Sequence, residues 1–431
     1  MANKKGILVV AFALFSLFFG AGNLILPPQL GFKAGSAWWL VLAGFGISAV
    51  LIPILGIVAH SRLQGTMFDF GKKVSPLFSL VYCYLVYAIS ITLPAPRTAS
   101  VTHEMAIAPS FEITSWVTSS IYFVLVFLFV INRSRILDVV GKILTPAIIL
   151  ILLAIILKAL FGFELSFGSN AFANPLTHGI LEGYQTFDAI GAVVVGGVII
   201  ISLNLKDGQA SFEHKKRIIA RAGLLAGLGL LLVYAGLVLT GALMQKEFDA
   251  AIARTALLNG LSLKTLGTTA TLLLSILVAL ACFTTAVGIV TGTADFVKGR
   301  FGGSQKAYIA TALIGCFLGV LMGQFNVGYI IAVALPALMF IYPVTIVLIL
   351  LNILPDSWAT PLLFRSVVAT TLVFSIPDFL GTIGFPDISK SLAGWMPLSE
   401  FHMGWVLPAI TVFLIVIGLQ SRGVISGRTP Q

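Results

Sequence analysis

The sequence has little charge. Only 10% of its 431 residues are Asp, Glu, Lys or Arg, whereas 58% are hydrophobic and the mean hydropathy is +1.05. This composition excludes a soluble domain, because apolar runs of about 18 residues or more, each long enough to cross a bilayer, recur along the whole chain. Within lipid the backbone must satisfy its own hydrogen bonds, so we expect these runs to be α-helices. They are too continuously apolar to be the alternating strands of a barrel.

Cysteine and acidic residues are also scarce. The three cysteines, Cys83, Cys282 and Cys316, lie in apolar runs without the spacing of a metal site or of a disulfide framework, so we interpret them as small buried residues. The net charge of +10 comes without any soluble basic region that could bind nucleic acid. The positive charge is instead typical of loops that face anionic lipid.

The apolar runs predict an all-α membrane protein with about twelve spanning helices. If the N-terminus is cytoplasmic, 19 of the 26 Lys and Arg residues fall on the cytoplasmic side, which supports this orientation and places both termini there. No connection is long enough for a separate soluble domain, so we expect residues 1–431 to form one membrane unit. The expected spans are residues 6–28, 36–60, 74–96, 115–132, 139–162, 180–204, 217–244, 266–297, 307–323, 327–352, 362–381 and 403–420.

The first span contains residues that weaken a helix about halfway across the membrane. Gly20, Ala21, Gly22 and Asn23 follow one another there, far from any charge. One interpretation is that the glycines allow close helix packing. The other is that the helix unwinds, which exposes backbone groups that only a ligand, an ion or water can satisfy, and directs the positive end of a half-helix into the protein.

The sixth span has a comparable stretch. Gln185, Thr186 and Asp188 lie among glycines, and an intramembrane carboxylate is costly enough to be a functional candidate, although Asp188 could also satisfy N–H groups at a helix start. Spans one and six correspond if residues 6–162 and 180–352 are two inverted five-helix repeats, followed by two additional helices at 362–420. Secondary transporters place broken helices at such positions.

Two further positions have competing interpretations. Thr284 and Thr285 lie in the middle of span eight, where hydroxyls usually bond to a carbonyl one turn earlier, but together with freed carbonyls of span one they could also hold a small hard cation. Arg97 follows "LPAP" near the predicted outer end of span three. It is either an arginine at the membrane boundary or an outer-gate residue that attracts a carboxylate.

Three motifs resemble one known family. They are "FSLFFGAGNLILPPQLG" near the start, "PAPRTASVTHE" at 94–104 and "EGYQTFDAIGA" at 182–192, and together they resemble the bacterial branched-chain amino acid:cation symporters of the amino acid–polyamine–organocation superfamily. The resemblance covers essentially the full length. It implies the leucine-transporter fold, a 5+5 inverted repeat with broken helices 1 and 6, and import of leucine, isoleucine or valine across the bacterial inner membrane.

The resemblance also implies roles for individual residues. The N–H groups at the glycine break would bind the substrate carboxylate, and Thr186 with neighbouring carbonyls would receive its ammonium group. The implied substrate-binding residues are Gly20, Ala21, Gly22, Asn23, Gln185, Thr186, Asp188 and Arg97. The implied Na⁺ site is formed by Ser16, Phe19, Ala281, Thr284 and Thr285. The aliphatic side chain would enter a pocket that includes Phe187 and Phe283.

Several alternatives remain at this point. A proton carried by Asp188 could replace Na⁺ as the coupling ion, and a channel-like permease is a second class, although the chain has no ring of charges or symmetric filter motif. An enzyme is not expected, because there is no HExxH pair and no phosphate-binding glycine motif. We expect no cofactor besides the coupling ion. The expected partners are an amino acid and the lipid bilayer, without nucleic acid or an obligatory protein.

Overall fold

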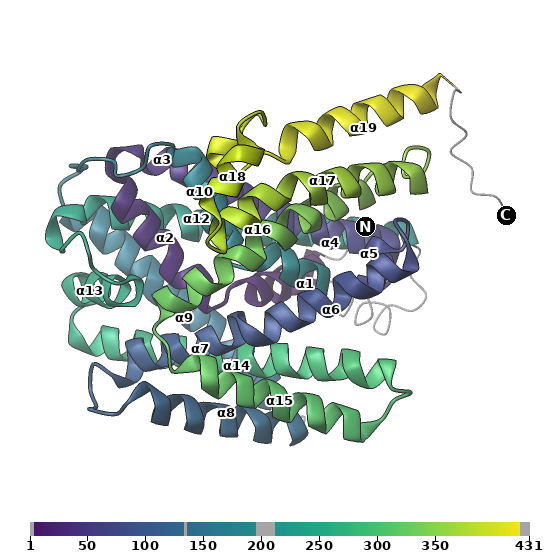
Figure 1. Ribbon diagram of the computed structural model, residues 1–431. Coiled ribbons are helices and arrows are strands. Elements are labelled where there is room, and N and C mark those ends of the chain that lie inside the picture. The colour runs from purple at the N-terminus through teal and green to yellow at the C-terminus, as the bar shows by residue number, and fades with distance from the viewer. Residues whose placement is uncertain (1–3, 133–135, 195–211, 423–431) are drawn as a thin grey trace.

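The computed structural model describes residues 4–132, 136–194 and 212–422, and this part of the chain contains helices and connecting segments but no strand (Figure 1). The first half comprises α1 (Lys4–Phe18), α2 (Ala21–Ala34), η1 (Gly35–Ala37), α3 (Trp38–Gly46), η2 (Ile47–Leu51), α4 (Ile52–Leu63), α5 (Met67–Gly71), α6 (Pro76–Thr92), α7 (Pro94–Thr102), η3 (His103–Ile107), α8 (Ser115–Asn132) and α9 (Ile136–Gly162).

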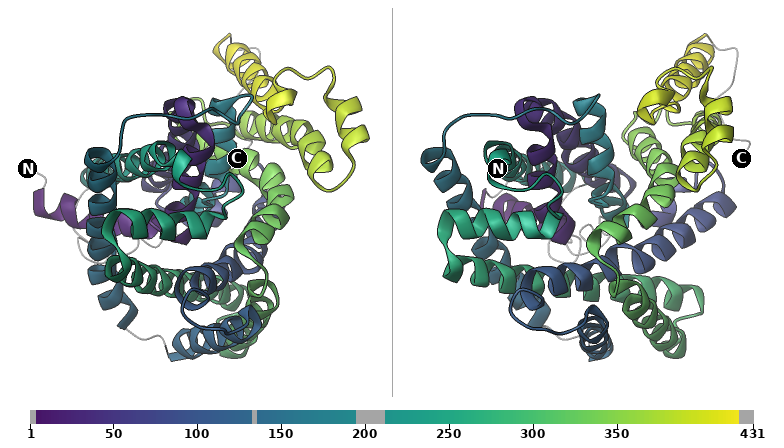
Figure 2. Two further views of the ribbon diagram at one scale, coloured as in Figure 1. Left: turned by 90° about the vertical axis from the view of Figure 1, so that its left-hand side faces the viewer. Right: turned by 60° about the vertical axis from the view of Figure 1, so that its left-hand side comes forward.

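The second half begins with α10 (Pro175–Tyr184), after which residues 188–194 are again helical. It continues with α12 (Phe212–Leu243), η4 (Gln245–Glu247), α13 (Arg254–Leu266), α14 (Thr268–Arg300), α15 (Gln305–Gly323), α16 (Val327–Asn352), α17 (Pro361–Thr382), α18 (Pro386–Ala393), η5 (Ser399–Phe401) and α19 (Val406–Ser421). Figure 2 shows α17, α18 and α19 grouped on one side of the bundle, where α17 packs on α16. The last predicted helices are therefore peripheral.

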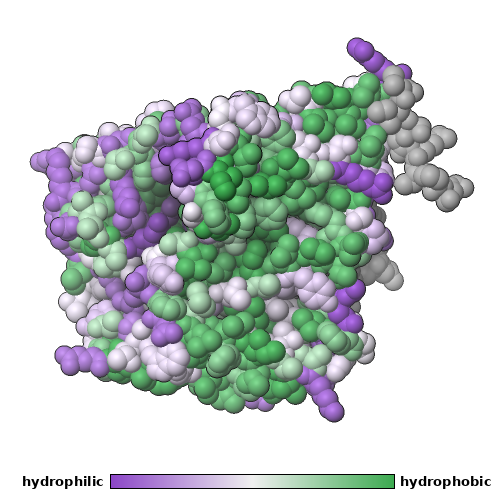
Figure 3. All heavy atoms as spheres, viewed as in Figure 1, coloured by the Kyte–Doolittle hydropathy of each residue, from purple (hydrophilic) through white to green (hydrophobic). Residues whose placement is uncertain are grey.

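The surface of the molecule fits a bilayer. Nine helical segments in the described part are long and apolar enough to cross a membrane. In one of them, α2 to α4 run on without a gap, so predicted spans one and two are joined, and α19 has only 16 residues. Figure 3 shows apolar residues across the broad middle of one face and hydrophilic residues gathered toward its two ends. The expected membrane-spanning helices are confirmed as a class, whereas the count of twelve stays a prediction.

The third span is longer than predicted. We expected it to end at residue 96, but α7 and η3 continue the helical segment to Ile107. Pro94 and Pro96 lie in the first turn of α7, where the missing N–H of a proline costs nothing. The prolines therefore start a second half of this span instead of ending it, and Arg97 lies inside the span.

A surface helix was not predicted. We expected a connection from residue 245 to 265, but Arg254–Leu266 forms α13, which packs on α9, α14 and α2. With α3 and α10 it lies at one end of the bundle, while α5 and the end of α4 lie at the other (Figure 1). Its buried leucines Leu257, Leu258 and Leu261 have helical spacing and face this packing.

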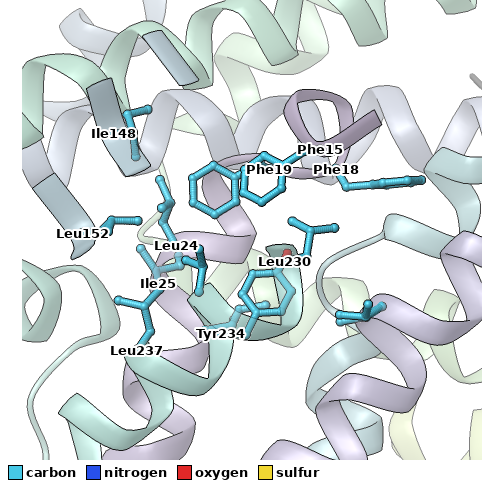
Figure 4. Close-up of a cluster of buried hydrophobic side chains, with 14 of the residues drawn as sticks. Phe15, Phe18, Phe19, Leu24, Ile25, Ile148, Leu152, Leu230, Tyr234 and Leu237 are labelled. Atoms are coloured by element: carbon cyan, nitrogen blue, oxygen red, sulfur yellow. The ribbon is translucent and has the colours of Figure 1, made fainter. Parts of the chain in front are cut away.

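The main apolar cluster surrounds the start of α2. Figure 4 shows Phe18 and Phe19 near Leu24 from α2 and Tyr234 from α12, with further side chains from α9. α2 also approaches α12 very closely, since a Cβ atom at Gly31 would lie 1.8 Å from the carbonyl oxygen of Val238. The glycines thus bring two backbones into contact, while the apolar cluster holds the end of α1 in place.

Candidate functional site

The first span is interrupted, as predicted. α1 ends at Phe18, and Gly20 is extended (φ −99°, ψ −177°) before α2 begins at Ala21. The interruption therefore lies at Phe19 and Gly20, at the beginning of the predicted stretch from Gly20 to Asn23. Gly20 N–H donates to Phe18 O, and Asn23 N–H donates to Gly20 O. The oxygens of Ser16 and Phe19 consequently lose the N–H groups that a continuous helix would offer them.

The sixth span is interrupted in the same way. α10 ends at Tyr184, and Phe187 has a left-handed φ of 62° before the helix resumes at residue 188. Asp188 N–H donates to Thr186 Oγ1 at 3.2 Å, and Ala189 N–H donates to the hydroxyl of Tyr342 at 3.2 Å. The start of the second half-helix is thus capped by two hydroxyls. Residues 195–204 of the predicted span lie outside the described residues.

Asn23 joins the two interruptions. Three oxygens lie within hydrogen-bond distance of its Nδ2 atom: Phe18 O at 2.5 Å, Asp188 Oδ2 at 2.7 Å and the hydroxyl of Tyr234 at 2.5 Å. Asn23 is buried, and so are Asp188 and Tyr234. A single amide therefore connects the end of α1, the second half of span six and α12. The Asp188 carboxylate accepts from this amide, and no hydrogen bond from a backbone N–H to it is found among the described residues.

Arg97 belongs to the same centre. Its side chain is buried, Nη1 donates to the carbonyl oxygen of Gln185 at 2.6 Å, and the guanidinium lies 5.4 Å from the ring centroid of Phe187. A Cβ atom at Gly22 would be 2.5 Å from Arg97 Nη2, so the guanidinium also lies directly over the first turn of α2. The interpretation of Arg97 as a boundary residue is wrong, because span three continues past it.

Gln185 contributes an unsatisfied group. Its side chain is buried, and Oε1 has no hydrogen-bond partner among the described residues. A buried acceptor of this kind is uncommon and is what a donor on a ligand would satisfy. Thr186 differs, since its hydroxyl already donates to Gly183 O at 2.8 Å. Gln185 thus offers an incoming ammonium group a free acceptor, whereas the Thr186 hydroxyl already has a hydrogen-bond partner.

The predicted cation ligands converge only in part. The hydroxyls of Thr284 and Thr285 both donate to Ala281 O at 2.9 Å, which is the local bond expected of threonine in a membrane helix. Thr285 nevertheless faces the first interruption, because a Cβ atom at Gly20 would be 3.9 Å from its Oγ1. With the freed oxygens of Ser16 and Phe19 nearby, this donor set of carbonyls and hydroxyls suits a small hard cation.

Three residues of the centre escaped the sequence analysis. Tyr234 and Tyr342 are fully buried partners of Asn23 and Ala189, and the hydroxyl of Thr145 on α9 shares a 2.8 Å hydrogen bond with Ser16 Oγ. The one signal in the sequence that could have indicated these three residues is the presence of a hydroxyl group in an apolar helix. Phe283, in contrast, packs with Tyr122 and Phe129 in a different cluster from the one that contains Phe187.

The comparisons with known proteins agree with this architecture. A family model described as "Branched-chain amino acid transport protein" matches residues 3–422. A branched-chain amino acid transport system 2 carrier protein of Pseudomonas aeruginosa is 31% identical, over 97% of both chains. The branched-chain amino acid permease BraB of Bacillus subtilis is 30% identical, over 94% of this chain and 93% of the relative.

Solved structures show the same fold at low sequence identity. Mhp1 in an inward-facing conformation has a TM-score of 0.60 at 13% identity and covers 96% of this chain and 91% of its own. MhsT in complex with L-phenylalanine has a TM-score of 0.54 at 16% identity, over 96% of this chain and 98% of that one. Both are transporters of the leucine-transporter fold, so the predicted fold class is confirmed.

The bacterial relatives and the apolar helices make this chain a multi-pass protein of the bacterial inner membrane. The predictions of a transport protein and against an enzyme are confirmed by these two relatives, which are a carrier and a permease by name, and by the family model. The chain belongs to the family of branched-chain amino acid transport proteins.

Proposed function

We propose that this protein imports leucine, isoleucine or valine by symport with Na⁺. The observation that carries the proposal is the meeting of two helix interruptions at one buried centre, where Asn23 binds Asp188 at 2.7 Å and Arg97 binds the Gln185 carbonyl at 2.6 Å. Broken helices that meet in this way provide half-helix ends for a zwitterion and freed carbonyls for a cation. The names of the relatives support branched-chain amino acids as the substrate class.

The substrate would lie between the two interruptions. Its carboxylate would accept hydrogen bonds from the N–H groups of residues 20–22, at the positive end of α2. Its ammonium group would be received by the carbonyl and the unpartnered Oε1 of Gln185, with Thr186 beside them. Asp188 would add negative charge at the same end, and Phe187, whose ring lies beside the Arg97 guanidinium, would contact the aliphatic side chain.

Sodium would bind at the other side of the first interruption. Ser16, Phe19 and Ala281 would offer carbonyl oxygens, while Thr284 and Thr285 would turn their hydroxyls from the Ala281 carbonyl toward the ion. Each positive charge that moves inward gains about 2.3 kcal/mol per 100 mV of membrane potential, which would drive uptake. Alternating access would come from rocking of one helix group against the other around this centre, as in an inverted-repeat transporter.

The experiment measures leucine uptake by the purified protein in proteoliposomes, with a Na⁺ gradient or a pH gradient imposed separately. We expect accumulation against a leucine gradient when Na⁺ is high outside and none from the pH gradient alone. Uptake driven by pH would favour the alternative in which Asp188 carries a proton. Equilibration without accumulation would favour a channel-like permease.

Thr285→Ala tests the cation site, and Thr293→Ala is the matched control. Thr293 lies two turns later on the same helix, is buried, and makes the same local bond, to Ile289 O at 2.9 Å. We expect Thr285→Ala to raise the Na⁺ concentration for half-maximal uptake by about tenfold or more, since a ligand is lost from a site with few ligands. Unchanged Na⁺ dependence in Thr285→Ala would show that the cation binds elsewhere.

A further inference from the structure

The buried charged side chains of the described residues fall into two separate places in the fold. Among the residues whose burial the structure describes, Arg97 is the one buried Lys or Arg, and Asp188 and Asp378 are the buried carboxylates. Asp378 binds His402 at 3.0 Å near the surface. Arg97 and Asp188 are the buried charged side chains next to the two interruptions, and they are 5% and 6% exposed. The charge of the proposed transport site therefore depends on these two residues.

Arg97 and Asp188 balance one another without an ion pair. Both side chains are buried, and no salt bridge joins these two residues in the described part of the chain. The guanidinium instead bonds to the backbone of Gln185, and the carboxylate bonds to Asn23. With Asp188 ionised, the two charges add to zero over the site, while each group is bound to neutral partners that a ligand could also use.

The guanidinium lies where the substrate's ammonium group is proposed to bind. It takes as its acceptor the carbonyl oxygen of Gln185, which is the oxygen proposed to receive the ammonium group. An ammonium group at the same carbonyl would bring two positive charges together in a buried place, which is strongly unfavourable. Substrate and guanidinium must therefore alternate at this acceptor.

We propose that the Arg97 guanidinium replaces the substrate's ammonium group at the Gln185 carbonyl whenever the site is without substrate, so that the unloaded carrier is neutral and can return. This inference rests on the proposed function and deepens it. Without substrate and Na⁺, the charges of Arg97 and Asp188 cancel. Without Arg97, the unloaded site would hold a lone buried carboxylate, which is costly in a membrane interior. A Na⁺ ion would cancel that charge in the loaded site, so the loaded carrier would still reorient.

Arg97→Gln separates the two halves of the cycle. Net uptake requires the unloaded carrier to return, whereas exchange of external labelled leucine for internal leucine requires only loaded carriers. In proteoliposomes with equal Na⁺ on both sides, we expect Arg97→Gln to lose a much smaller share of its leucine exchange than of its net uptake. We expect its net uptake, with Na⁺ high outside only, to fall by about tenfold or more.

Two controls accompany this variant. Arg97→Lys keeps the charge and should recover net uptake well above the Arg97→Gln value, while Arg300→Gln removes an exposed arginine at the end of α14 and should change neither process. Thermal stabilisation of Arg97→Gln by added leucine shows that the variant is folded and still binds substrate.

Three results would overturn the proposal. If Arg97→Gln lost exchange and leucine-induced stabilisation together with net uptake, Arg97 would simply be a ligand of the substrate carboxylate. Normal net uptake by Arg97→Gln would show that the return step does not need its charge, and equal losses in Arg97→Gln and Arg97→Lys would exclude an electrostatic cause. The proposed function fails separately, if the unchanged protein neither exchanges nor accumulates leucine.

Discussion

Asn23 shows how much of the centre depends on one side chain. Its amide nitrogen is within 2.7 Å of oxygens from α1, span six and α12, and all three partners are otherwise shielded from water. Buried polar groups that lose a partner keep the full cost of their desolvation. Asn23 therefore stabilises the interruption of the first span as well as the position of Asp188.

Replacing Asn23 with alanine should damage both transport and stability. The Phe18 carbonyl and the Asp188 carboxylate would each lose a donor, at a cost of about 1–3 kcal/mol per group. We expect leucine uptake to fall about tenfold or more and the melting temperature in detergent to decrease. Asn170→Ala is the control, since Asn170 is exposed and bonds only within its own turn, to Phe172. Equal effects of the two substitutions would contradict the role of Asn23.

The sequence indicated Asn23, Asp188 and the two interruptions, because glycines and a carboxylate are unusual in the middle of an apolar run. It did not indicate the place of Arg97. Prolines at 94 and 96 can end a helix or begin one, and local sequence does not distinguish these cases. The partners Tyr234 and Tyr342 come from distant helices, so their positions depend on packing that the sequence pattern does not contain.

At the scale of elements, close backbone packing fixes α2 on α12. A Cβ atom at Gly31 would be 1.8 Å from Val238 O, and one at Gly241 would be 2.0 Å from Pro28 O, so the two helices approach through glycines on both sides. Such contacts have no flexible side chain that could move away. The half-helix that carries the proposed carboxylate site is thus positioned by α12.

Gly31→Ala should therefore disturb the protein strongly, although alanine favours helices. The new methyl group must push the two backbones apart, which we expect to cost about 1–3 kcal/mol or more and to lower the melting temperature by several degrees. Gly288→Ala on α14 is the matched control, because a Cβ atom there meets nothing within 4 Å. It should leave the melting temperature unchanged or raise it slightly. A Gly31→Ala variant as stable as Gly288→Ala would argue against the close packing.

The connection between α18 and α19 is fixed to α17 by a titratable pair. His402 Nδ1 lies 3.0 Å from Asp378 Oδ1, and this hydrogen bond raises the pKa of His402 above its usual value of 6.5. A raised pKa in the folded protein means that the pair stabilises it fully at pH values below the unfolded pKa of His402. The contribution is lost as the pH rises through the higher, folded pKa.

We expect stability to show this pH dependence. The melting temperature should decrease slightly from about pH 6 to pH 8, which corresponds to a loss of about 0.5 kcal/mol in the free energy of unfolding. The effect is small because His402 is half exposed and solvent screens the pair. His402→Gln should remove that part of the pH profile while leaving the profile otherwise parallel. An identical profile for His402→Gln and the unchanged protein would show that the pair contributes nothing measurable.

The two interruptions were predictable as elements and α13 was not. Gly20 and the residues around Thr186 have low helix propensity inside apolar runs, which is a strong local signal. α13 begins and ends within a polar connection, and its apolar positions Leu257, Leu258 and Leu261 bury only because α9, α14 and α2 are there to receive them. Its helical structure depends on tertiary packing more than on propensity.

At the scale of the whole molecule, hydropathy and charge were sufficient to predict an all-α membrane protein, whereas the leucine-transporter fold was implied by the resemblance of three motifs. The lengths of the apolar runs require helices, and low charge leaves no soluble domain. The helices α2 to α4 follow one another without a connection. The number of spans is therefore harder to predict from hydropathy than the presence of membrane-spanning helices. The inverted repeat also remains a prediction from the positions of the two interruptions, since the halves lack evident residue similarity.

The orientation of the molecule leads to the last prediction. The distribution of Lys and Arg predicts that the connection between α9 and α10 faces outward and that the connection between α5 and α6 faces the cytoplasm. Cysteines introduced by Ser169→Cys and Lys72→Cys would report on these sides, since both positions are exposed and the natural cysteines Cys83, Cys282 and Cys316 are buried. A membrane-impermeant maleimide should label Ser169→Cys in intact cells and Lys72→Cys only after the membrane is opened. The reversed labelling pattern would place the termini outside. It would contradict the orientation predicted from the Lys and Arg distribution.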